Sequence, residues 1–192
     1  MDDLQTPAQG AGPLLERDYW AVLDGARVGP AELAALVARH LEEFAPPTLV
    51  RFSRRRGDGA SLDVGDELDV HIRGAGSFAV RVVHRDRNSL TVATLPGHPE
   101  AGRITFGAYR HRRGDVIFHI RSRARAGSRS QLAGFIFAGD PMQTNTWSDF
   151  IDRLAHSVGD GVLGAIHAEK RRVAEEPGDR QLNAPTFVAE GD

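Results

Sequence analysis

The feature that most restricts the fold of this chain is a run of short segments, between residues 48 and 125, in which apolar and polar residues alternate. In ELDVHI, residues 67–72, Leu68 and Val70 point to one face and Asp69 to the other. One buried and one solvated face is typical of an antiparallel sheet. Six segments carry the pattern: residues 48–54, 67–72, 77–85, 89–95, 103–111 and 115–125. The sequence therefore predicts six consecutive antiparallel strands.

The last of these segments carries a row of mostly basic residues on one face. We expect its inward face to hold Val116, Phe118, Ile120, Ser122 and Ala124, and its outward face to hold Ile117, His119, Arg121, Arg123 and Arg125. We interpret the basic row as a solvated outer face of the sheet. Anion binding is the alternative. The chain has 24 basic and 26 acidic residues and a formal net charge of −2, which gives little support to a polyanion-binding role.

One strand and one helix are expected ahead of this run. Residues 18–24, DYWAVLD, are short, aromatic and branched, which favours a strand. In residues 29–44, Leu33, Val37 and Leu41 recur at helical spacing, and the helix is bounded by prolines on both sides.

A second helical pattern follows the strands and begins at a capping box formed by Thr146 and Asp149. Apolar residues then recur at steps of three and four: Trp147, Phe150, Ile151, Leu154, Val158, Val162 and Ile166. The spacing predicts one long helix. Gly159, Gly161 and Gly164 either break it or bring it close to a neighbour, since each glycine costs a helix interior about 1 kcal/mol. The predicted order is β-α-β6-α: an α+β fold whose curved antiparallel sheet wraps around the C-terminal helix.

The length of 192 residues fits one domain. We assign that domain to residues 17–173. Residues 1–16 and 174–192 are treated as flexible tails, because both are rich in Pro, Gly and polar residues and lack an apolar period.

Composition narrows the class of protein further. The absence of cysteine excludes disulfides, thiolate catalysis and cysteine-ligated zinc. The longest near-apolar run, residues 132–139, is far shorter than the roughly 20 residues that span a bilayer. We therefore expect a soluble cytoplasmic protein, monomeric or homodimeric, with no membrane span, no nucleic-acid partner, no metal and no cofactor.

The loop TLPGHPEAGR, residues 94–103, combines two prolines and two glycines with His98 and Glu100. The prolines remove backbone donors and stiffen the loop, whereas the glycines permit positive φ angles. One interpretation is structural: His98 and Glu100 tie the loop down through backbone hydrogen bonds. In the other, the loop closes one mouth of a cavity and presents both side chains to a ligand. Two such residues are too few for a typical zinc site.

This loop also carries a family resemblance. Thr94 to Glu100, with Gly102 and the later Phe106, resembles the TLPGHPExGE signature of a bacterial and plant family described as a domain of unknown function. Where that family usually has an acidic residue, this chain has Arg103. The family is grouped with the helix-grip superfamily of START domains, polyketide cyclases and birch-allergen-like proteins. The resemblance implies a sheet and a long helix around a hydrophobic cavity.

Together these patterns predict a ligand site between the sheet and the C-terminal helix. We expect an apolar wall and a few polar groups, as in most small-molecule pockets. The candidate ligand-binding residues are His98, Glu100, Tyr109, Phe78, Phe106, Phe118, Phe135, Phe137, Trp147, Ile151 and Leu154. The expected partner is a small apolar or amphipathic molecule that is bound without being transformed, so no residue is assigned as catalytic. The alternatives are a cyclase- or hydrolase-type enzyme using the same cavity, with His98 or Glu100 as general acid or base, and a protein–protein interaction module with a filled core.

Overall fold

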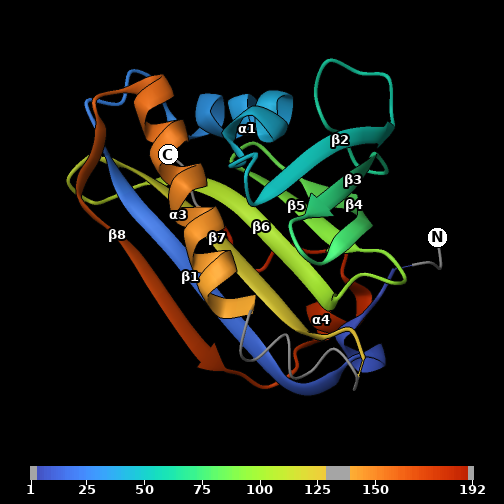
Figure 1. The fold of residues 1–192 in the computed structure, drawn as a ribbon. Coiled ribbons are helices and arrows are strands. Elements are labelled where there is room, and N and C mark those ends of the chain that lie inside the picture. Colours follow the sequence, from blue (N-terminus) through green and yellow to red (C-terminus); the bar gives the residue numbers. More distant parts are fainter. Residues whose placement is uncertain (1–3, 129–138, 190–192) are drawn as a thin grey trace.

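The computed structural model describes residues 4–128 and 139–189. Within these ranges the strands are β1 (Ala11–Asp24), β2 (Val50–Arg56), β3 (Glu67–Ile72), β4 (Gly76–Arg85), β5 (Ser89–Thr94), β6 (Glu100–Arg110), β7 (Val116–Ala126) and β8 (Gly161–Arg172). The helices are the 3-10 helix η1 (Pro7–Gln9), α1 (Pro30–Phe44), α3 (Gly139–Val158) and α4 (Pro177–Gln181). The strands form one antiparallel sheet in the order β2-β3-β4-β5-β6-β7-β1-β8 (Figure 1). The predicted α+β class and curved sheet are confirmed, and β8 adds one strand to the predicted seven.

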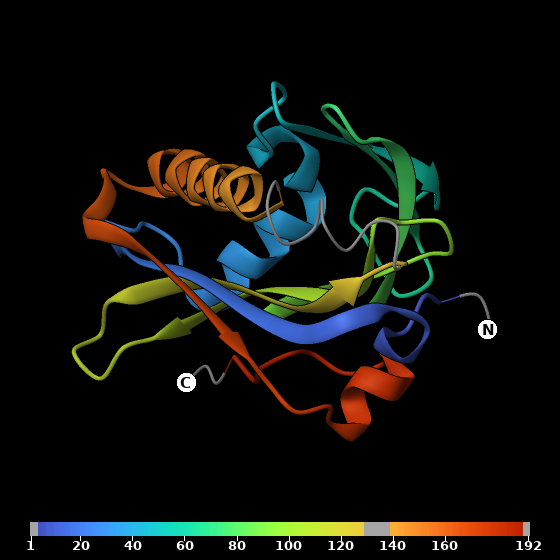
Figure 2. The same ribbon diagram turned by 60° about the horizontal axis from the view of Figure 1, so that its bottom comes forward.

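The sheet separates the two long helices from the C-terminal part of the chain. Figure 2 shows α1 and α3 on the concave side of the sheet and α4 on the opposite, convex side. None of the helices in the described ranges is both long enough and apolar enough to cross a lipid bilayer.

The core lies between the concave face of the sheet and the C-terminal half of α3. The ring of Phe150 stacks on Phe118 with centroids 6.1 Å apart, and meets Phe44 of α1 edge-on at 5.7 Å. Ile151 and Leu154 are also fully buried. Each such side chain contributes roughly 1.5–3 kcal/mol through burial. These contacts fix the C-terminal half of α3 on the sheet, while its N-terminal half borders a pocket.

The prediction that the last helix continues to Ile166 is wrong. The helix ends at Val158, and residues 161–172 form β8, which pairs with β1. A Cβ on Gly159 would lie 2.3 Å from the carbonyl oxygen of Asp24, and Gly161 has a φ of +108°. Both glycines are therefore needed where the chain turns from helix into strand. The apolar residues beyond this turn matched a helical period only by chance.

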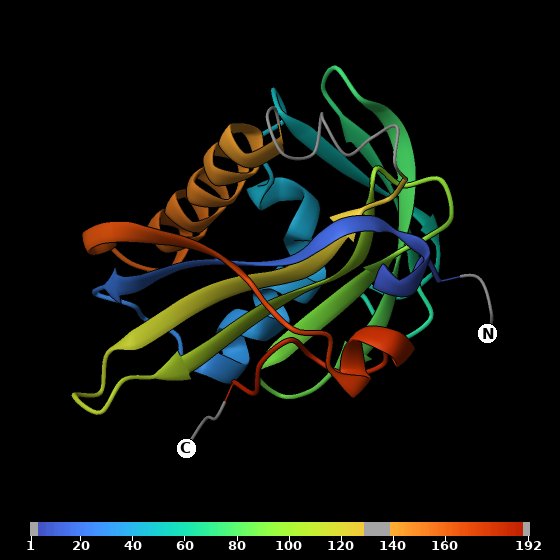
Figure 3. The same ribbon diagram turned by 90° about the horizontal axis from the view of Figure 1, so that it is seen from below.

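The two predicted tails also need correction. Residues 11–16 belong to β1, and residues 177–181 form α4. Residues 173–189, which we call the C-terminal strap, run across the convex face of the sheet (Figure 3). Leu182 within it is fully buried, and the ring of Phe187 stacks on His119 of β7 at 4.4 Å.

The strap changes the interpretation of the basic row on β7, which is not a solvated face. Arg123 is only 3 % exposed and His119 only 8 %. Arg123 donates two parallel hydrogen bonds to Asp179 of the strap, Nε to Oδ1 at 2.9 Å and Nη2 to Oδ2 at 2.7 Å. It also donates to Glu16 of β1 at 2.5 Å. The two carboxylates that bond to Arg123 come one from each predicted tail, so the alternation within β7 alone could not reveal them.

Candidate functional site

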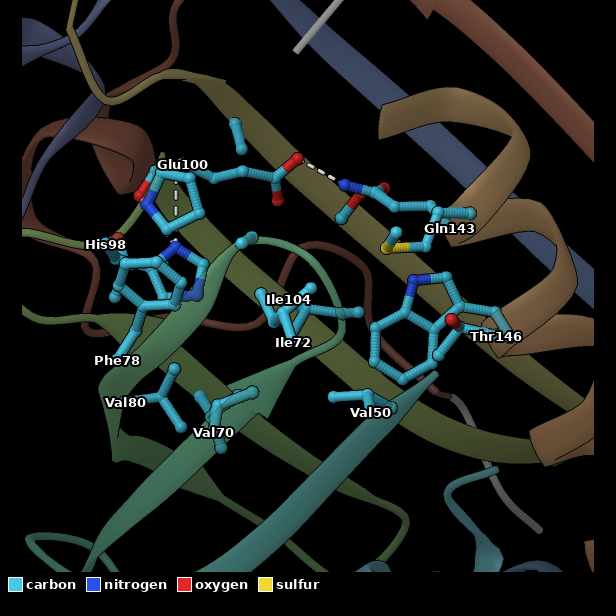
Figure 4. Close-up of a pocket in the computed structure, with 18 of the residues that line it drawn as sticks. Val50, Val70, Ile72, Phe78, Val80, His98, Glu100, Ile104, Gln143 and Thr146 are labelled. Carbon is cyan, nitrogen blue, oxygen red and sulfur yellow. Dashed lines mark hydrogen bonds between the residues drawn. The ribbon is translucent and has the colours of Figure 1, made fainter. Parts of the chain in front are cut away.

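A pocket of about 520 Å³ lies between the concave face of the sheet and the N-terminal half of α3. Its walls come from the inner faces of β2 to β7, the loop after β5 and the first turns of α3 (Figure 4). The lining is divided into a large apolar part and a small polar end, visible in Figure 4 as the Val50–Val70–Val80 side and the Glu100–Gln143 side.

The apolar part follows from the strand alternation, which places every second side chain on the concave face. It comprises Val50, Phe52, Val70, Ile72, Phe78, Val80, Val92, Ile104, Phe106 and Trp147. Trp147 of α3 packs edge-on against Phe106 of β6 with centroids 5.6 Å apart. This contact sets how closely the N-terminal half of α3 approaches the sheet, and so leaves the remaining space open.

The loop between β5 and β6 is held in place by the N-terminal segment. The side-chain amide of Gln5 donates to the carbonyl oxygens of His98 (2.8 Å) and Glu100 (3.0 Å), and its oxygen accepts from the backbone N–H of Gly97 (2.8 Å). Gly97 has a φ of +93°, a conformation that glycine adopts without strain. The loop therefore presents His98 and Glu100 to the pocket from a fixed backbone.

His98 is a neutral hydrogen-bond donor in this site. The backbone N–H of Glu100 lies 3.0 Å from His98 Nδ1, and the carbonyl oxygen of Glu100 lies 3.2 Å from the same nitrogen. Since a backbone N–H can only donate, the shorter contact makes Nδ1 an acceptor and assigns the ring hydrogen to Nε2. Nε2 makes no hydrogen bond to any residue that the structure describes. Burial lowers the pKa of His98 to about 4, and the ring also packs against Phe78 with centroids 5.3 Å apart. The imidazole is thus uncharged at neutral pH.

Glu100 organises the polar end of the pocket. Its carboxylate accepts a hydrogen bond from the side-chain amide of Gln143 on α3 (Figure 4). Nη1 of Arg17 on β1 lies 3.7 Å from Oε1 of Glu100. The Arg17 side chain is 1 % exposed. Two further wall atoms, Gln143 Oε1 and Ser122 Oγ, are buried and have no hydrogen-bond partner in the described part of the chain.

The structure brings together some of the sequence-predicted residues and separates others. Those that line the pocket are Phe78, His98, Glu100, Phe106 and Trp147. Those buried in the core instead are Phe118, Ile151 and Leu154. Phe135 and Phe137 lie outside the described residues.

Tyr109 points away from the pocket, onto the convex face. Phe106 and Ala108 of β6 face the concave side, so the alternation turns Tyr109 outward, where its hydroxyl lies 3.5 Å from Nδ1 of His119. Burial raises the pKa of the Tyr109 hydroxyl. The prediction that Tyr109 is a polar residue of the cavity was wrong, because the two-residue strand period was not applied to it.

Four residues that line the pocket, hold its loop or lie beside Glu100 were missed: Gln5, Arg17, Ser122 and Gln143. Arg17 shares a face with Tyr19, so extending the predicted first strand by one residue would have placed it on the inner side. Ser122 was predicted to point inward but was not weighed as a site residue. For Gln5 and Gln143 no local pattern signals the role. Among the described residues, no group of three or more His, Cys, Asp or Glu side chains could hold a metal ion.

Comparisons with known proteins agree with this architecture. A family model described as a domain of unknown function, DUF1990, matches residues 18–148. A comparison with curated proteins gives no match.

Solved structures share the fold at low sequence identity. Norcoclaurine synthase from Thalictrum flavum, in complex with dopamine and hydroxybenzaldehyde, is 11% identical with a TM-score of 0.54, covering 80% of this chain and 90% of its own. The major latex-like protein 151 from Panax ginseng is 12% identical with a TM-score of 0.51, covering 78% and 100%. A Thermobifida fusca protein solved by NMR is 15% identical with a TM-score of 0.51, covering 74% and 93%.

Proposed function

The chain belongs to the DUF1990 family, whose function is unknown, and from its helix-grip fold and its pocket we propose that it binds a small hydrophobic or amphipathic molecule. The observation that carries this proposal is the pocket between the sheet and α3. Its volume of about 520 Å³ falls within the range of roughly 300–1,000 Å³ typical of small-molecule sites. Its apolar wall with a few polar groups at one end is the usual composition of such sites.

One of the fold relatives was solved with small molecules bound. The norcoclaurine synthase structure holds two small aromatic molecules, dopamine and hydroxybenzaldehyde. At 11% identity the likeness is one of fold, so it supports the presence of a ligand site and says nothing of which ligand this chain takes.

The polar groups favour binding over catalysis. A general acid or base works best with a pKa near the operating pH, whereas burial holds the pKa of His98 at about 4. Its Nδ1 is also occupied by the Glu100 backbone N–H. The Glu100 carboxylate is engaged by Gln143 and lies beside Arg17. These groups are arranged to hold and orient a polar atom rather than to exchange a proton with it.

Native mass spectrometry of the freshly purified protein, compared with its denatured mass, tests the proposal directly. An excess mass that disappears on denaturation would show a bound molecule and begin to identify it.

A blocking variant links that ligand to the pocket. Ile104→Trp places a large ring in the pocket and should abolish the excess mass, at a packing cost of about 1–3 kcal/mol. Leu163→Trp is the matched control, because Leu163 on β8 is 53 % exposed and lies outside the pocket. The proposal fails if both variants retain the ligand equally. If the wild-type protein carries no extra mass and does not bind added decanol, an apolar probe with one polar end, we would assign the pocket no ligand and test for protein partners.

A further inference from the structure

The imidazole of His98 offers the pocket one hydrogen-bond donor. The lone pair of Nδ1 is engaged by the backbone N–H of Glu100 at 3.0 Å, so the ring hydrogen lies on Nε2, which has no partner among the described residues. The unpartnered side-chain atoms that are closed off from solvent in the described chain include Ser122 Oγ and Gln143 Oε1 but not this nitrogen, so Nε2 remains accessible. His98 can therefore donate one hydrogen bond to a molecule in the pocket and cannot accept one.

The wall around this donor is apolar. His98 lines the pocket, and its ring packs against Phe78 with centroids 5.3 Å apart. Figure 4 shows the ring beside Phe78, with Glu100 on one side and Val80 and Ile104 on the other. Because Nδ1 is turned toward the backbone of Glu100, Nε2 lies on the side of the ring that faces away from it. The donor is thus set among hydrocarbon side chains.

The donor is also held in one place. Gln5 donates to the carbonyl oxygens of His98 and Glu100 at 2.8 and 3.0 Å, and the hydroxyl of Thr94 accepts from the N–H of Gly102 at 3.0 Å. Burial lowers the pKa of His98 to about 4, so the ring is neutral at neutral pH. A donor fixed before the ligand arrives loses little freedom on binding, which favours ligands that match its position.

We propose that the ligand of this pocket presents a carbonyl oxygen, as in a ketone, an aldehyde or an ester, to Nε2 of His98; this inference rests on the proposed function. A carbonyl oxygen only accepts, which matches a side chain that only donates. A hydroxyl would also accept from Nε2, but its own hydrogen would need an acceptor, and the side chains of Phe78, Val80 and Ile104 have none. A hydrocarbon would leave the N–H unpaired, and an unpaired buried donor is costly.

Two probes of nearly the same shape test this: methyl octyl ketone, and the alkene in which a methylene group replaces its carbonyl oxygen. Of the chain's two tryptophans, Trp147 lines the pocket, whereas Trp20 stacks on His167 of β8, away from it. In a Trp20→Phe protein the fluorescence of Trp147 therefore reports the binding of either probe. Binding of neither probe would count against the proposed function itself.

A variant without the donor shows whether His98 recognises the carbonyl. His98→Phe in the same background removes Nε2 but keeps a ring against Phe78. The affinity for the ketone relative to the alkene should fall about threefold to tenfold, which corresponds to one hydrogen bond between neutral groups. A merely structural effect would weaken both probes alike. Val80→Ala is the matched control, because it alters the apolar wall without removing the donor and should keep the wild-type ratio. An unchanged ratio in a folded His98→Phe protein would overturn this inference while leaving ligand binding intact.

The infrared band of the bound ketone gives a readout that also works without a variant. A hydrogen bond weakens the C=O bond, so the stretching frequency of the ketone in the wild-type protein should lie below its value in an alkane solvent. In His98→Phe it should return toward the alkane value. A band at the alkane value in the wild-type protein would overturn the inference even if His98→Phe does not fold. A lowered band that persists in the folded variant would also overturn it, because the donor would then be water.

Discussion

Replacing Asp179 by alanine tests how strongly the C-terminal strap stabilises the fold. The Asp179 side chain is fully buried and accepts hydrogen bonds from Nε and Nη2 of Arg123, and Arg103 lies 3.4 Å away. Breaking a buried ion pair by removing one partner costs about 3–5 kcal/mol, because the other charge remains buried. Arg123 keeps its bond to Glu16, whereas the buried Nε and Nη1 of Arg103 already lack partners in the described chain. We therefore expect Asp179→Ala to lose about 3–5 kcal/mol, a large part of the roughly 5–15 kcal/mol that stabilises a typical domain.

Urea unfolding at neutral pH measures this loss, with Glu176→Ala as the matched control. Glu176 lies 3.7 Å from the same Arg123, but its side chain is 66 % exposed, so its removal should cost at most about 1 kcal/mol. Equal losses in the two variants would refute the reasoning that burial decides the contribution.

The effect of Asp179→Ala should also depend on pH with a definite sign. Burial alone would raise the pKa of Asp179, but the hydrogen bonds and charge of Arg123 hold it below its ordinary value of 3.8. The carboxylate therefore contributes its full stability above about pH 3.8 and loses it as the pH falls through the depressed pKa. The difference between the wild-type protein and Asp179→Ala should shrink in strong acid, and a difference that grows there would contradict this linkage.

Three further predictions concern the loop and the helix end. Gly159→Ala should sharply lower the melting temperature, because the Cβ of the alanine would lie 2.3 Å from the carbonyl oxygen of Asp24. A melting temperature within about a degree of the wild-type value would show that the turn can shift to make room. Gln5→Ala removes three hydrogen bonds to the loop and should lower the free energy of unfolding in urea by about 1–3 kcal/mol. The pKa of His98, followed by NMR, should rise from about 4 toward 6.5 as the loop loosens. An unmoved pKa would mean that Gln5 does not control the burial of His98. The pKa of His98 is lower in the folded state than its ordinary value of 6.5, so the free energy of unfolding should fall as the pH drops from 6.5 toward 4. His98→Gln should flatten that part of the profile of stability against pH. An equally steep profile in the variant would assign the loss to other groups.

The sheet was predictable from sequence because its signal is local. Leu68, Val70 and the residues that alternate with them needed only the two-residue strand period to be placed on the correct face. The same period, applied to Tyr109, would have turned that residue away from the pocket. His98 and Glu100 were found because the loop around them concentrates turn-forming residues with titratable ones.

What sequence reasoning missed depends on contacts between distant segments. The bond from Gln143 to Glu100 joins α3 to β6, and that from Asp179 to Arg123 joins the strap to β7. No spacing or composition in the sequence indicates that these residues are partners. Val162 and Ile166, after Gly161, happened to continue the helical spacing. The positive φ of Gly161, where the chain leaves the helix, is indicated in the sequence only by the glycine itself.

The strap also has a consequence for how the chain folds as it is made. The arginines of β6 and β7 are synthesised well before residues 173–189, so Arg103 and Arg123 must wait for the carboxylate of Asp179. β1 likewise waits for both of its neighbours, since it pairs with β7 and β8 from much later in the sequence. Pairings between such distant segments slow folding. The emerging chain therefore completes its sheet only after β8 has left the ribosome, and the carboxylate that pairs with Arg103 and Arg123 arrives later still.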